Sequence, residues 1–405
     1  GSRLTMGVII DFIWHLAPFI LVLSLVVTIH ELGHFLAARA CGVAVERFSI
    51  GFGRALFSRR DRSGVEWRIG WIPLGGYVMF AGDPNVASVP DAAGLQAMKA
   101  EILAKSGPEA LARHYHFKPV WQRALVTAAG PAANFLLAIV LFAALFMTFG
   151  ERTLAPRIGA VEAGGVAEAA GFQKGDLVVE AAGRRIGSFQ DLIEVVQVRG
   201  GAPTEFVVNR AGREIRLTAT PEWRRIESEP GAPRVGRIGL GPTGEVVRQA
   251  FGPIEAVAKG VERTWRVLTT SVYAMGRMIT GQMSAEQLNG PLGIAQMSGQ
   301  IAKAGAEAAP DLGRKVLYAG ANLIALAAVL SVGIGFMNLL PVPVLDGGHL
   351  MFYAYEAVAR RPLSANVQAA GYRVGLALVL ALMLFATWND LQRLQVFQFL
   401  GGLFS

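Results

Sequence analysis

The segment T-I-H-E-L-G-H-F, from Thr28 to Phe35, contains the pattern H-E-x-x-H, and the rest of the chain is best understood from it. A spacing of four residues places His30 and His34 on one face of a helix. Two imidazoles in that arrangement can bind one Zn²⁺ ion, and Glu31 beside them can take a proton from water. The pattern therefore predicts His30 and His34 as metal ligands and Glu31 as a catalytic base.

The surroundings of this pattern indicate a membrane helix. Leu16–Ile29 is an apolar run without charge, and Phe35–Ala38 continue it. A charge at the centre of a bilayer costs about 2.5–3.5 kcal/mol on insertion scales, so ionisable groups in a membrane helix are functional by default. A soluble helix can carry the same pattern on a solvated face, but in an apolar membrane helix the ionisable groups would cost free energy. The sequence therefore favours a metal site at membrane depth.

The composition also indicates a membrane protein. Of the 405 residues, 53% are hydrophobic and 17% are charged, and the mean hydropathy is +0.42. The net charge is +8, but the positive residues cluster near apolar segments, so we expect a membrane rather than a nucleic-acid partner. The single cysteine, Cys41, excludes an internal disulfide and a cysteine-only metal site.

Four apolar segments are candidates for transmembrane helices. They are Val8–Ala40, Ala124–Phe149, Val316–Leu340 and Val374–Trp388. The last is short, and we expect Arg373 to snorkel so that it can cross. Basic residues gather between the first two segments and between the last two. By the positive-inside rule these loops are cytoplasmic, and the region between the second and third segments is external, as are both termini.

Two strands are predicted between the first two spans, at Val45–Phe57 and Val65–Met79. The second contains W-I-P-L-G-G-Y, Trp71–Tyr77, in which Pro73 favours an edge strand. An edge strand beside an active site can pair with an extended substrate; a hairpin that only packs is the alternative. The predicted substrate contacts in it are Trp71, Ile72, Pro73, Leu74, Gly75 and Gly76. A polar loop with one helix, about Ala92–Ser106, should follow.

A soluble domain is predicted over Ile158–Thr220. Its expected elements are strands at Ile158–Glu162, Leu177–Ala181, Glu205–Asn209 and Glu214–Ala219, with a helix near Gln190–Val198. Gly171–Leu177 resembles the signature region of PDZ domains, and Arg237–Gly241 resembles their carboxylate-binding loop. Free backbone N–H groups in such a loop can hold a peptide C-terminus. A domain that only blocks access is the alternative.

Residues Phe251–Lys303 have an amphipathic, methionine-rich helical pattern with a break at Asn289–Ile294. We interpret them as membrane-surface helices that lead into the third span. A plain linker is the alternative.

A second motif, N-L-L-P-V-P-V-L-D-G-G-H, runs from Asn338 to His349 at the end of the third span. Its prolines must open the helix, and open backbone at membrane depth is tolerated where it lines a cavity. Asp346 follows this break, and two histidines with one carboxylate leave a fourth zinc position for water. Two alternatives stay open: His349 competes as the ligand, and Asp346 could instead cap the next helix.

Together these motifs resemble a known family. H-E-x-x-H in a first span, G-P-A-A-N (Gly130–Asn134) in a second, a PDZ-like insert and N-x-x-P-x-P-x-L-D-G-G are similar to the site-2 protease family of intramembrane zinc metalloproteases, in its regulator-of-sigma-E protease (RseP) branch. The resemblance covers nearly the whole chain. One departure is that the best-known members carry tandem PDZ domains, whereas this chain has room for one.

The resemblance implies a set of site residues, a location and a class of substrate. The site residues are the zinc ligands His30, His34 and Asp346, the catalytic base Glu31, the substrate contact Asn338, and the residues Asn134, Pro341 and Pro343 that shape the site. Trp71–Tyr77 would be a membrane-reentrant β-element. The location would be the bacterial inner membrane, with a periplasmic PDZ domain and an active site towards the cytoplasm. Substrates would be single-span proteins trimmed by another protease, such as an anti-sigma factor, and signal-peptide remnants.

The expected fold is therefore a polytopic α-helical membrane protein with four transmembrane helices, a membrane-associated β-hairpin and a periplasmic α+β PDZ domain. The predicted divisions are 1–41 (first helix), 42–119 (loop with the β-element), 120–150 (second helix), 151–245 (PDZ domain), 246–315 (surface helices), 316–349 (third helix with the proline motif) and 350–405 (loop, fourth helix and tail).

The expected function is zinc-dependent hydrolysis of a peptide bond in or near a transmembrane segment. One alternative is a membrane-anchored zincin that acts on soluble or misfolded proteins; such enzymes usually take their third ligand from a helix outside the membrane. A second alternative is a non-catalytic PDZ adaptor, which the intact Glu31 between two histidines disfavours.

Overall fold

The computed structural model describes residues 2–81, 92–197, 199–225, 234–280, 294, 298 and 311–393. The chain divides into two compact units. One unit combines Gly1–Leu145 with Ala256–Ser405, and the other is Phe146–Glu255.

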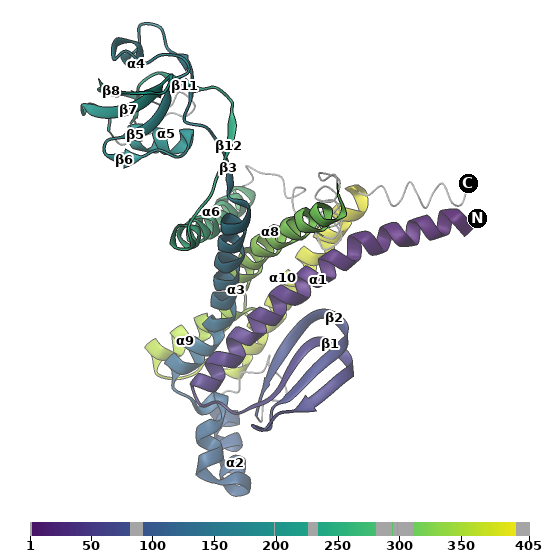
Figure 1. Ribbon diagram of the computed structural model, residues 1–405. Helices are drawn as coiled ribbons and strands as arrows, with labels where there is room; N and C mark the ends of the chain where they lie inside the picture. The colour runs from purple at the N-terminus through teal and green to yellow at the C-terminus, as the bar shows by residue number, and fades with distance from the viewer. Residues whose placement is uncertain are drawn as a thin grey trace. The chain divides into compact units, whose positions relative to one another are not determined.

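The first unit is mainly helical (Figure 1). Its helices are α1 (Ser2–Ala40), α2 (Ala92–Arg113), the short 3₁₀ helix η1 (Tyr115–Phe117), α3 (Val120–Phe149, which continues into the second unit), α6 (Pro253–Ile279), α8 (Leu312–Asn338), α9 (Asp346–Ala359) and α10 (Ala365–Arg393). Within the described residues, four helical segments are long and apolar enough to cross a membrane. They are Leu16–Ala40, Val120–Phe149, Leu312–Asn338 and Asn366–Trp388.

These helices agree with the four predicted spans, with differences at the boundaries. α1 continues through Pro18 and ends where Gly42 adopts a positive φ of 67°, so that the Val43 N–H can bond the Ala38 carbonyl oxygen at 2.8 Å. α2 breaks at Gly107, close to the predicted end of that helix.

The prediction of a short fourth span was wrong. α10 begins at Ala365, so Arg373 lies inside the helix and not at its end. The apolar part of α10 covers 23 residues, which is enough to cross a bilayer without a snorkelling arginine. The sequence pattern stopped at the charge of Arg373, although the alanines and the glutamine that precede it favour a helix.

Three helices of the first unit share a core. Val22 and Val26 of α1 pack with Ala327 of α8, and side chains of α3 lie against this cluster. The approach of α1 to α3 is very close at Gly33, where an added Cβ atom would lie 2.3 Å from the Ala129 carbonyl oxygen. A side chain at this position would therefore push the two helices apart.

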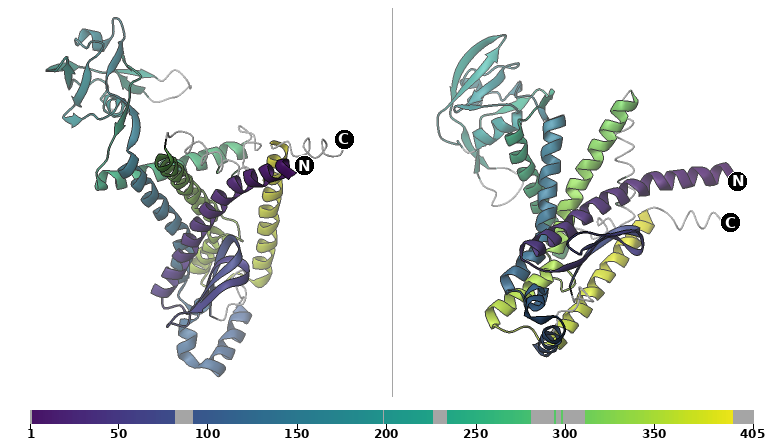
Figure 2. Two further views of the ribbon diagram at one scale, coloured as in Figure 1. Left: turned by 45° about the vertical axis from the view of Figure 1, so that its right-hand side comes forward. Right: turned by 60° about the horizontal axis from the view of Figure 1, so that its bottom comes forward.

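A β-sheet lies along α1 in both views of Figure 2. It is built from β1 (Val45–Arg60) and β2 (Glu66–Phe80), as predicted. Both strands bend at glycines, and Ile50 pairs with both Gly76 and Ile69. The first half of β1 therefore lies between the two halves of β2, and the segment Gly76–Phe80 forms one edge of the sheet.

Two further contacts fix this sheet. Asp61 closes the turn between β1 and β2. Hydrogen bonds from Ser63 and Trp67 lower the pKa of its carboxyl group to about 2. Beside the first span, the Ser24 hydroxyl donates to the Pro73 carbonyl oxygen at 2.5 Å. The sheet is thus attached directly to the helix that carries the H-E-x-x-H motif.

The second unit is an α+β domain. Its strands are β3 (Glu151–Leu154), β4 (Ile158–Val161), β5 (Leu177–Ala181), β6 (Arg184–Arg185), β7 (Thr204–Arg210), β8 (Arg213–Ala219), β9 (Glu222–Arg225), β10 (Arg234–Arg237), β11 (Leu240–Pro242) and β12 (Val246–Gln249), with helices α4 (Val166–Ala169) and α5 (Phe189–Gln197). β6, β5, β7 and β8 form a four-stranded sheet, while β11 pairs with β4. The four strands and the helix predicted here are confirmed.

The core of this domain contains side chains from the sheet and from α5, among them Phe206, Val208 and Leu192. A buried ion pair closes one side, because Arg210 donates to both carboxylate oxygens of Asp176 at 2.7 Å. Burial acts to raise the pKa of Asp176, but the bonds from Arg210 and from the Gln173 backbone outweigh it and lower the pKa.

The predicted surface helices are described only in part. α6 is amphipathic, with Ile254 and Trp265 exposed and charged residues such as Glu262 in ion pairs along it. At Gly260 an added Cβ would lie 2.6 Å from the Ile139 carbonyl oxygen, so this helix packs closely on α3. The predicted break at Asn289–Ile294 lies outside the described residues except for Ile294.

Candidate active site

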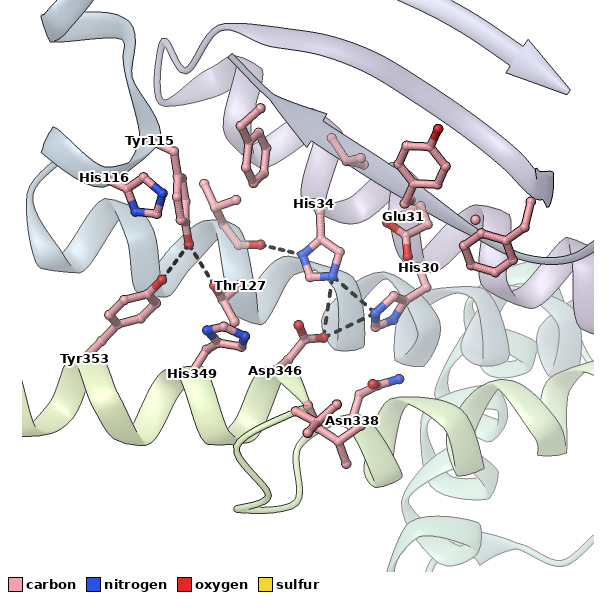
Figure 3. A pocket seen from close by; sticks show the side chains of 18 residues that line it. His30, Glu31, His34, Tyr115, His116, Thr127, Asn338, Asp346, His349 and Tyr353 are labelled. Atoms are coloured by element: carbon pink, nitrogen blue, oxygen red, sulfur yellow. Dashed lines mark hydrogen bonds and ion pairs between the residues drawn. The ribbon is translucent and has the colours of Figure 1, made fainter. Parts of the chain in front are cut away.

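Three predicted side chains converge at one point between α1 and α9. The Nε2 atoms of His30 and His34 are 3.1 Å apart. The Asp346 Oδ2 atom lies 3.2 Å from the first and 3.5 Å from the second. Figure 3 shows the two imidazoles and the carboxylate pointing toward one another. Residues more than 300 positions apart in the sequence thus meet in one cluster, as the H-E-x-x-H and L-D-G-G motifs predicted.

The hydrogen bonds around the two imidazoles fix which nitrogen faces the cluster. His34 Nδ1 lies 2.9 Å from the Val126 carbonyl oxygen, an acceptor, so Nδ1 carries the proton. The buried Asn134 amide lies 3.3 Å from His30 Nδ1. The structure places the amide nitrogen Nδ2 at this distance and leaves the buried amide oxygen without a partner among the described residues. The flipped amide puts the oxygen at the ring instead, where it accepts the Nδ1 proton. Both Nε2 atoms then present lone pairs.

Such a cluster fits a divalent cation. Two imidazole lone pairs and a carboxylate oxygen face one another, and Asp346 Oδ2 is buried without a hydrogen-bond donor among the described residues. Lone pairs held this close repel one another unless a cation lies between them. Tetrahedral zinc with bonds of about 2.0–2.2 Å would set its ligand atoms about 3.3 Å apart, and the three observed separations bracket that spacing.

A glycine of α3 makes room for the imidazoles. A Cβ atom added at Gly130 would lie 2.3 Å from His34 Nε2 and 2.9 Å from His30 Cε1. The edges of the His30 and His34 rings therefore lie directly against the backbone of α3 at Gly130. Gly130 belongs to the G-P-A-A-N motif, in which Asn134 supplies the amide at His30, so one turn of α3 forms the floor of the cluster.

The loop before α9 aims Asp346 at the histidines. α8 ends at Asn338, and the chain passes Pro341 and Pro343 before α9 begins. Added Cβ atoms at Gly347 and Gly348 would lie 2.2 Å from carbonyl oxygens of this loop. The two glycines therefore let the helix start directly against the loop.

The structure distinguishes between the alternatives for Asp346. The N-cap of α9 is Leu345, and Asp346 is the first helical residue, so its side chain does not act as the cap. The His349 ring contacts the Tyr372 hydroxyl, 3.2 Å from Nε2. His349 is outside the group of three ligand atoms that lie within 4.8 Å of one another. Asp346 is therefore the better candidate for the third ligand.

Glu31 lines the same cavity of about 370 Å³ as the three converging residues. A Cβ atom at Gly76 would lie 3.3 Å from Glu31 Cγ, and the backbone of Val78 reaches the Glu31 carboxylate. The other lining residues are Phe52, Gly76, Tyr77, Val78, Phe80, Tyr115, His116, Val126, Thr127, Asn338, Val344, Leu345, His349 and Tyr353. The edge segment Gly76–Phe80 therefore borders the cavity.

The remaining predicted residues are placed as follows. Asn338 lines the cavity, and its Nδ2 donates to the Ile334 carbonyl oxygen at 3.0 Å. Pro343 packs against Gly371 and Gly375 of α10. Of the segment predicted to contact substrate, Gly76 lines the cavity. Trp71 and Ile72 are exposed, Gly75 packs on Phe52, and neither they nor Pro73 is among its lining residues. For Leu74 only the backbone, within β2, is described.

Sequence patterns gave no sign of the polar residues at the far end of the cavity. The Tyr115 hydroxyl lies 3.0 Å from both Thr127 Oγ1 and the Tyr353 hydroxyl. Beside them Arg123 forms an ion pair with Glu356 at 2.6 Å. These contacts join η1, α3 and α9, so they hold in place the helix that carries Asp346. Two of them, Tyr115–Tyr353 and Arg123–Glu356, pair residues more than 200 positions apart, which local spacing does not reveal.

Comparison with known proteins places the chain in a family. The model of peptidase family M50 matches residues 18–382. The chain belongs to this family. It is 50% identical over 402 residues to metalloprotease MmpA of Caulobacter vibrioides, covering 98% of this chain and all of that protein. It is 42% identical over 388 residues to a putative zinc metalloprotease of Agrobacterium fabrum, covering 94% of this chain and 96% of that protein.

A third relative is from the regulator-of-sigma-E protease branch that the sequence motifs resemble. The chain is 30% identical over 484 residues to the regulator of sigma-E protease RseP of Salmonella typhimurium, covering 95% of this chain and all of that protein. The protein is accordingly a zinc metalloprotease, and its four apolar helical segments are those of a membrane-embedded enzyme.

The close contact at Gly130 leads to a testable prediction. Gly130→Ala places a methyl group against the His34 ring, so the imidazoles must move, and we expect zinc affinity to fall about 10–100-fold. The measurement is zinc content after dialysis against graded chelator. Gly333→Ala in α8 is the control, because a Cβ there meets nothing within 4 Å. Unchanged zinc affinity in Gly130→Ala would show that the rings do not depend on this contact.

Proposed function

We propose that this enzyme hydrolyses a peptide bond within or near a transmembrane segment of its substrate. The proposal rests on which helices supply the three converging side chains. His30 and His34 lie in the apolar helix α1, and Asp346 follows the apolar helix α8 after a loop. Reacting groups held by membrane-spanning elements can reach a peptide bond that is itself in the membrane.

The proposed roles follow from the geometry of the cavity. His30, His34 and Asp346 hold zinc, which when bound supplies a Lewis acid that lowers the pKa of water and polarises a carbonyl. Glu31 takes the proton from the attacking water and passes it to the leaving amine. Asn134 and the Val126 carbonyl keep the two rings in their metal-binding tautomers. Asn338, the last residue of α8 before the loop that leads to Asp346, contacts the substrate in the cavity.

A substrate helix must unwind before it is cut, because its carbonyl groups are engaged in i→i−4 hydrogen bonds. Backbone groups released in this way need new partners at membrane depth. The edge segment Gly76–Phe80 borders the cavity beside Glu31 and can supply them by adding the substrate as a strand. We assign substrate pairing to this edge.

The cellular setting is part of the proposal. We infer single-span membrane proteins already trimmed by another protease, of the anti-sigma-factor type, and signal-peptide remnants as substrates, as in regulated intramembrane proteolysis. The name of the Salmonella relative is consistent with this class. The family resemblance and the bacterial relatives support a bacterial inner membrane. The arginines and lysines that flank the spans favour an orientation with the active site near the cytoplasmic side and the second unit in the periplasm.

A cleavage assay with Glu31→Gln tests this function. The variant keeps the zinc ligands but lacks the base, so we expect normal zinc content and a rate lower by about 10²–10⁴-fold. Each variant is co-expressed with a tagged single-span substrate whose external part has been removed, and the shortened product is followed by immunoblot. Cleavage at the wild-type rate by Glu31→Gln would exclude Glu31 as the base.

The same assay separates this function from a membrane-anchored zincin that degrades soluble or misfolded proteins. For that comparison the substrate's transmembrane segment is replaced by a polar linker, and the cut site is mapped by mass spectrometry. Intramembrane cleavage requires the apolar segment. If cuts fall only in soluble sequence, the alternative is correct.

We further propose that the second unit is a PDZ domain that binds a peptide C-terminus. Its groove of about 230 Å³ lies between α5 and residues 236–240. Leu192, Ile193, Val196 and Ile238 give it an apolar lining, which suits an apolar last residue. The loop at Gly239 has a positive φ of 80° and can turn backbone N–H groups toward a carboxylate.

Peptide binding to the full-length protein in detergent tests this assignment. A fluorescent peptide ending in valine should bind at least about tenfold more tightly than its C-terminal amide, since the free carboxylate carries a charge-assisted bond. Ile193→Glu, which places a negative charge in the groove, should remove the difference. Equal affinity of the acid and the amide for wild type would contradict carboxylate recognition.

A further inference from the structure

A third histidine shares the cavity with the metal-binding cluster. His349 lies three residues after Asp346 on α9, so both side chains project from the same face of the helix, about 5–6 Å apart at their Cβ atoms. Figure 3 shows its ring beside Asp346 and below Thr127. His349 lines the cavity but is not part of the cluster that fits the metal.

The fourth apolar helix holds this ring in place. The Tyr372 hydroxyl of α10 lies 3.2 Å from His349 Nε2 and 3.4 Å from Nδ1. Phe352 packs edge-on against both rings. α10 can approach so closely because Gly371 and Gly375 face the Pro343 ring. The imidazole is therefore positioned by residues of two helices before any substrate binds.

A hydrogen-bond donor in this cavity would have a role in the reaction. When water adds to the scissile carbonyl, its oxygen gains negative charge, and a prepositioned N–H group stabilises that charge. In Figure 3, Glu31 lies on one side of the His34 and Asp346 pair and His349 lies on the other. A carbonyl held between them would meet water on the Glu31 side and a ring N–H on the His349 side.

Tyr372 can donate its hydroxyl proton to one nitrogen of the His349 ring, which leaves the ring proton on the other nitrogen as a donor. Two other polar groups of the cavity are hydrogen-bonded within the protein. Asn338 Nδ2 donates to the Ile334 carbonyl oxygen, and the Tyr115 hydroxyl is shared between Thr127 and Tyr353. We propose that His349 is a catalytic residue that donates a ring N–H to the scissile carbonyl oxygen as it becomes negative, and that Tyr372 is its positioning residue. His349 keeps its proton throughout, because Glu31 carries the water proton to the leaving amine.

This inference rests on the proposed function for the roles of Glu31 and zinc, and its test uses comparisons within one protein. The variants are His349→Leu, which removes the donor, His349→Gln, which restores an N–H group, and Tyr372→Phe. Tyr355→Phe is the control, since Tyr355 is on the same helix but exposed and outside the cavity. For each protein in detergent, kcat, KM, zinc content and affinity for a phosphinate peptide, which mimics the tetrahedral state, are measured.

The expected result separates stabilisation of the transition state from substrate binding. His349→Leu should lower kcat by about 10²-fold with little change in KM and full zinc content, and should weaken phosphinate binding by a similar factor. His349→Gln should recover part of both losses, and Tyr372→Phe should show a smaller loss of the same kind. The control should match wild type.

Two results would overturn the proposal. One is wild-type kcat and phosphinate affinity in His349→Leu; the other is loss of zinc from this variant, which would assign the ring to the metal site. If wild type cuts only soluble sequence, the intramembrane function fails, and the same comparison with a fluorescent unfolded polypeptide as substrate still tests His349.

Discussion

Three electron-rich groups facing one another inside an apolar helical bundle form the constraint on which this structure depends. Two imidazole lone pairs and a carboxylate oxygen converge to within 3.5 Å. A buried charge without a counter-charge is very unfavourable, and more so among membrane helices. A cation between these groups would therefore stabilise the site, and the surrounding elements keep the three atoms at ligand spacing.

Glycines carry much of that arrangement. Gly33 lets α1 touch α3, Gly130 leaves room for the two rings, and Gly347 lets α9 start against the preceding loop. Each glycine removes a side chain where backbone must come within about 3 Å of another group. The fold thus uses close backbone approach to bring a residue near the N-terminus and a residue near the C-terminus together.

The parts of the site that sequence could predict are those encoded locally. The i, i+4 spacing places His30 and His34 on one helix face, and the prolines mark the broken helix before Asp346. Sequence alone left Asp346 and His349 both open as ligands, because they are one turn apart on the same face and only packing separates them. Resemblance to a family pointed to Asp346, and the fold brings it to the histidines.

Features that depend on long-range packing were not predictable in the same way. The alternation of β2 predicted a strand but not that it folds back around β1. Of the predicted contacts Trp71–Gly76, Gly76 lines the cavity, and the cavity edge continues from there to Phe80. The start of α10 was missed because a single arginine interrupts its apolar pattern. The contacts of Tyr115 with Thr127 and Tyr353 leave no periodic signal.

Zinc X-ray absorption spectroscopy on purified protein tests the central claim most directly. In a Cys41→Ser background no cysteine remains, so the account predicts a first shell of only nitrogen and oxygen at about 2.0–2.2 Å. Adding Asp346→Cys should introduce one sulfur at about 2.3 Å. A zinc-loaded Asp346→Cys protein without that sulfur would show that residue 346 does not bind the metal, and would contradict the account.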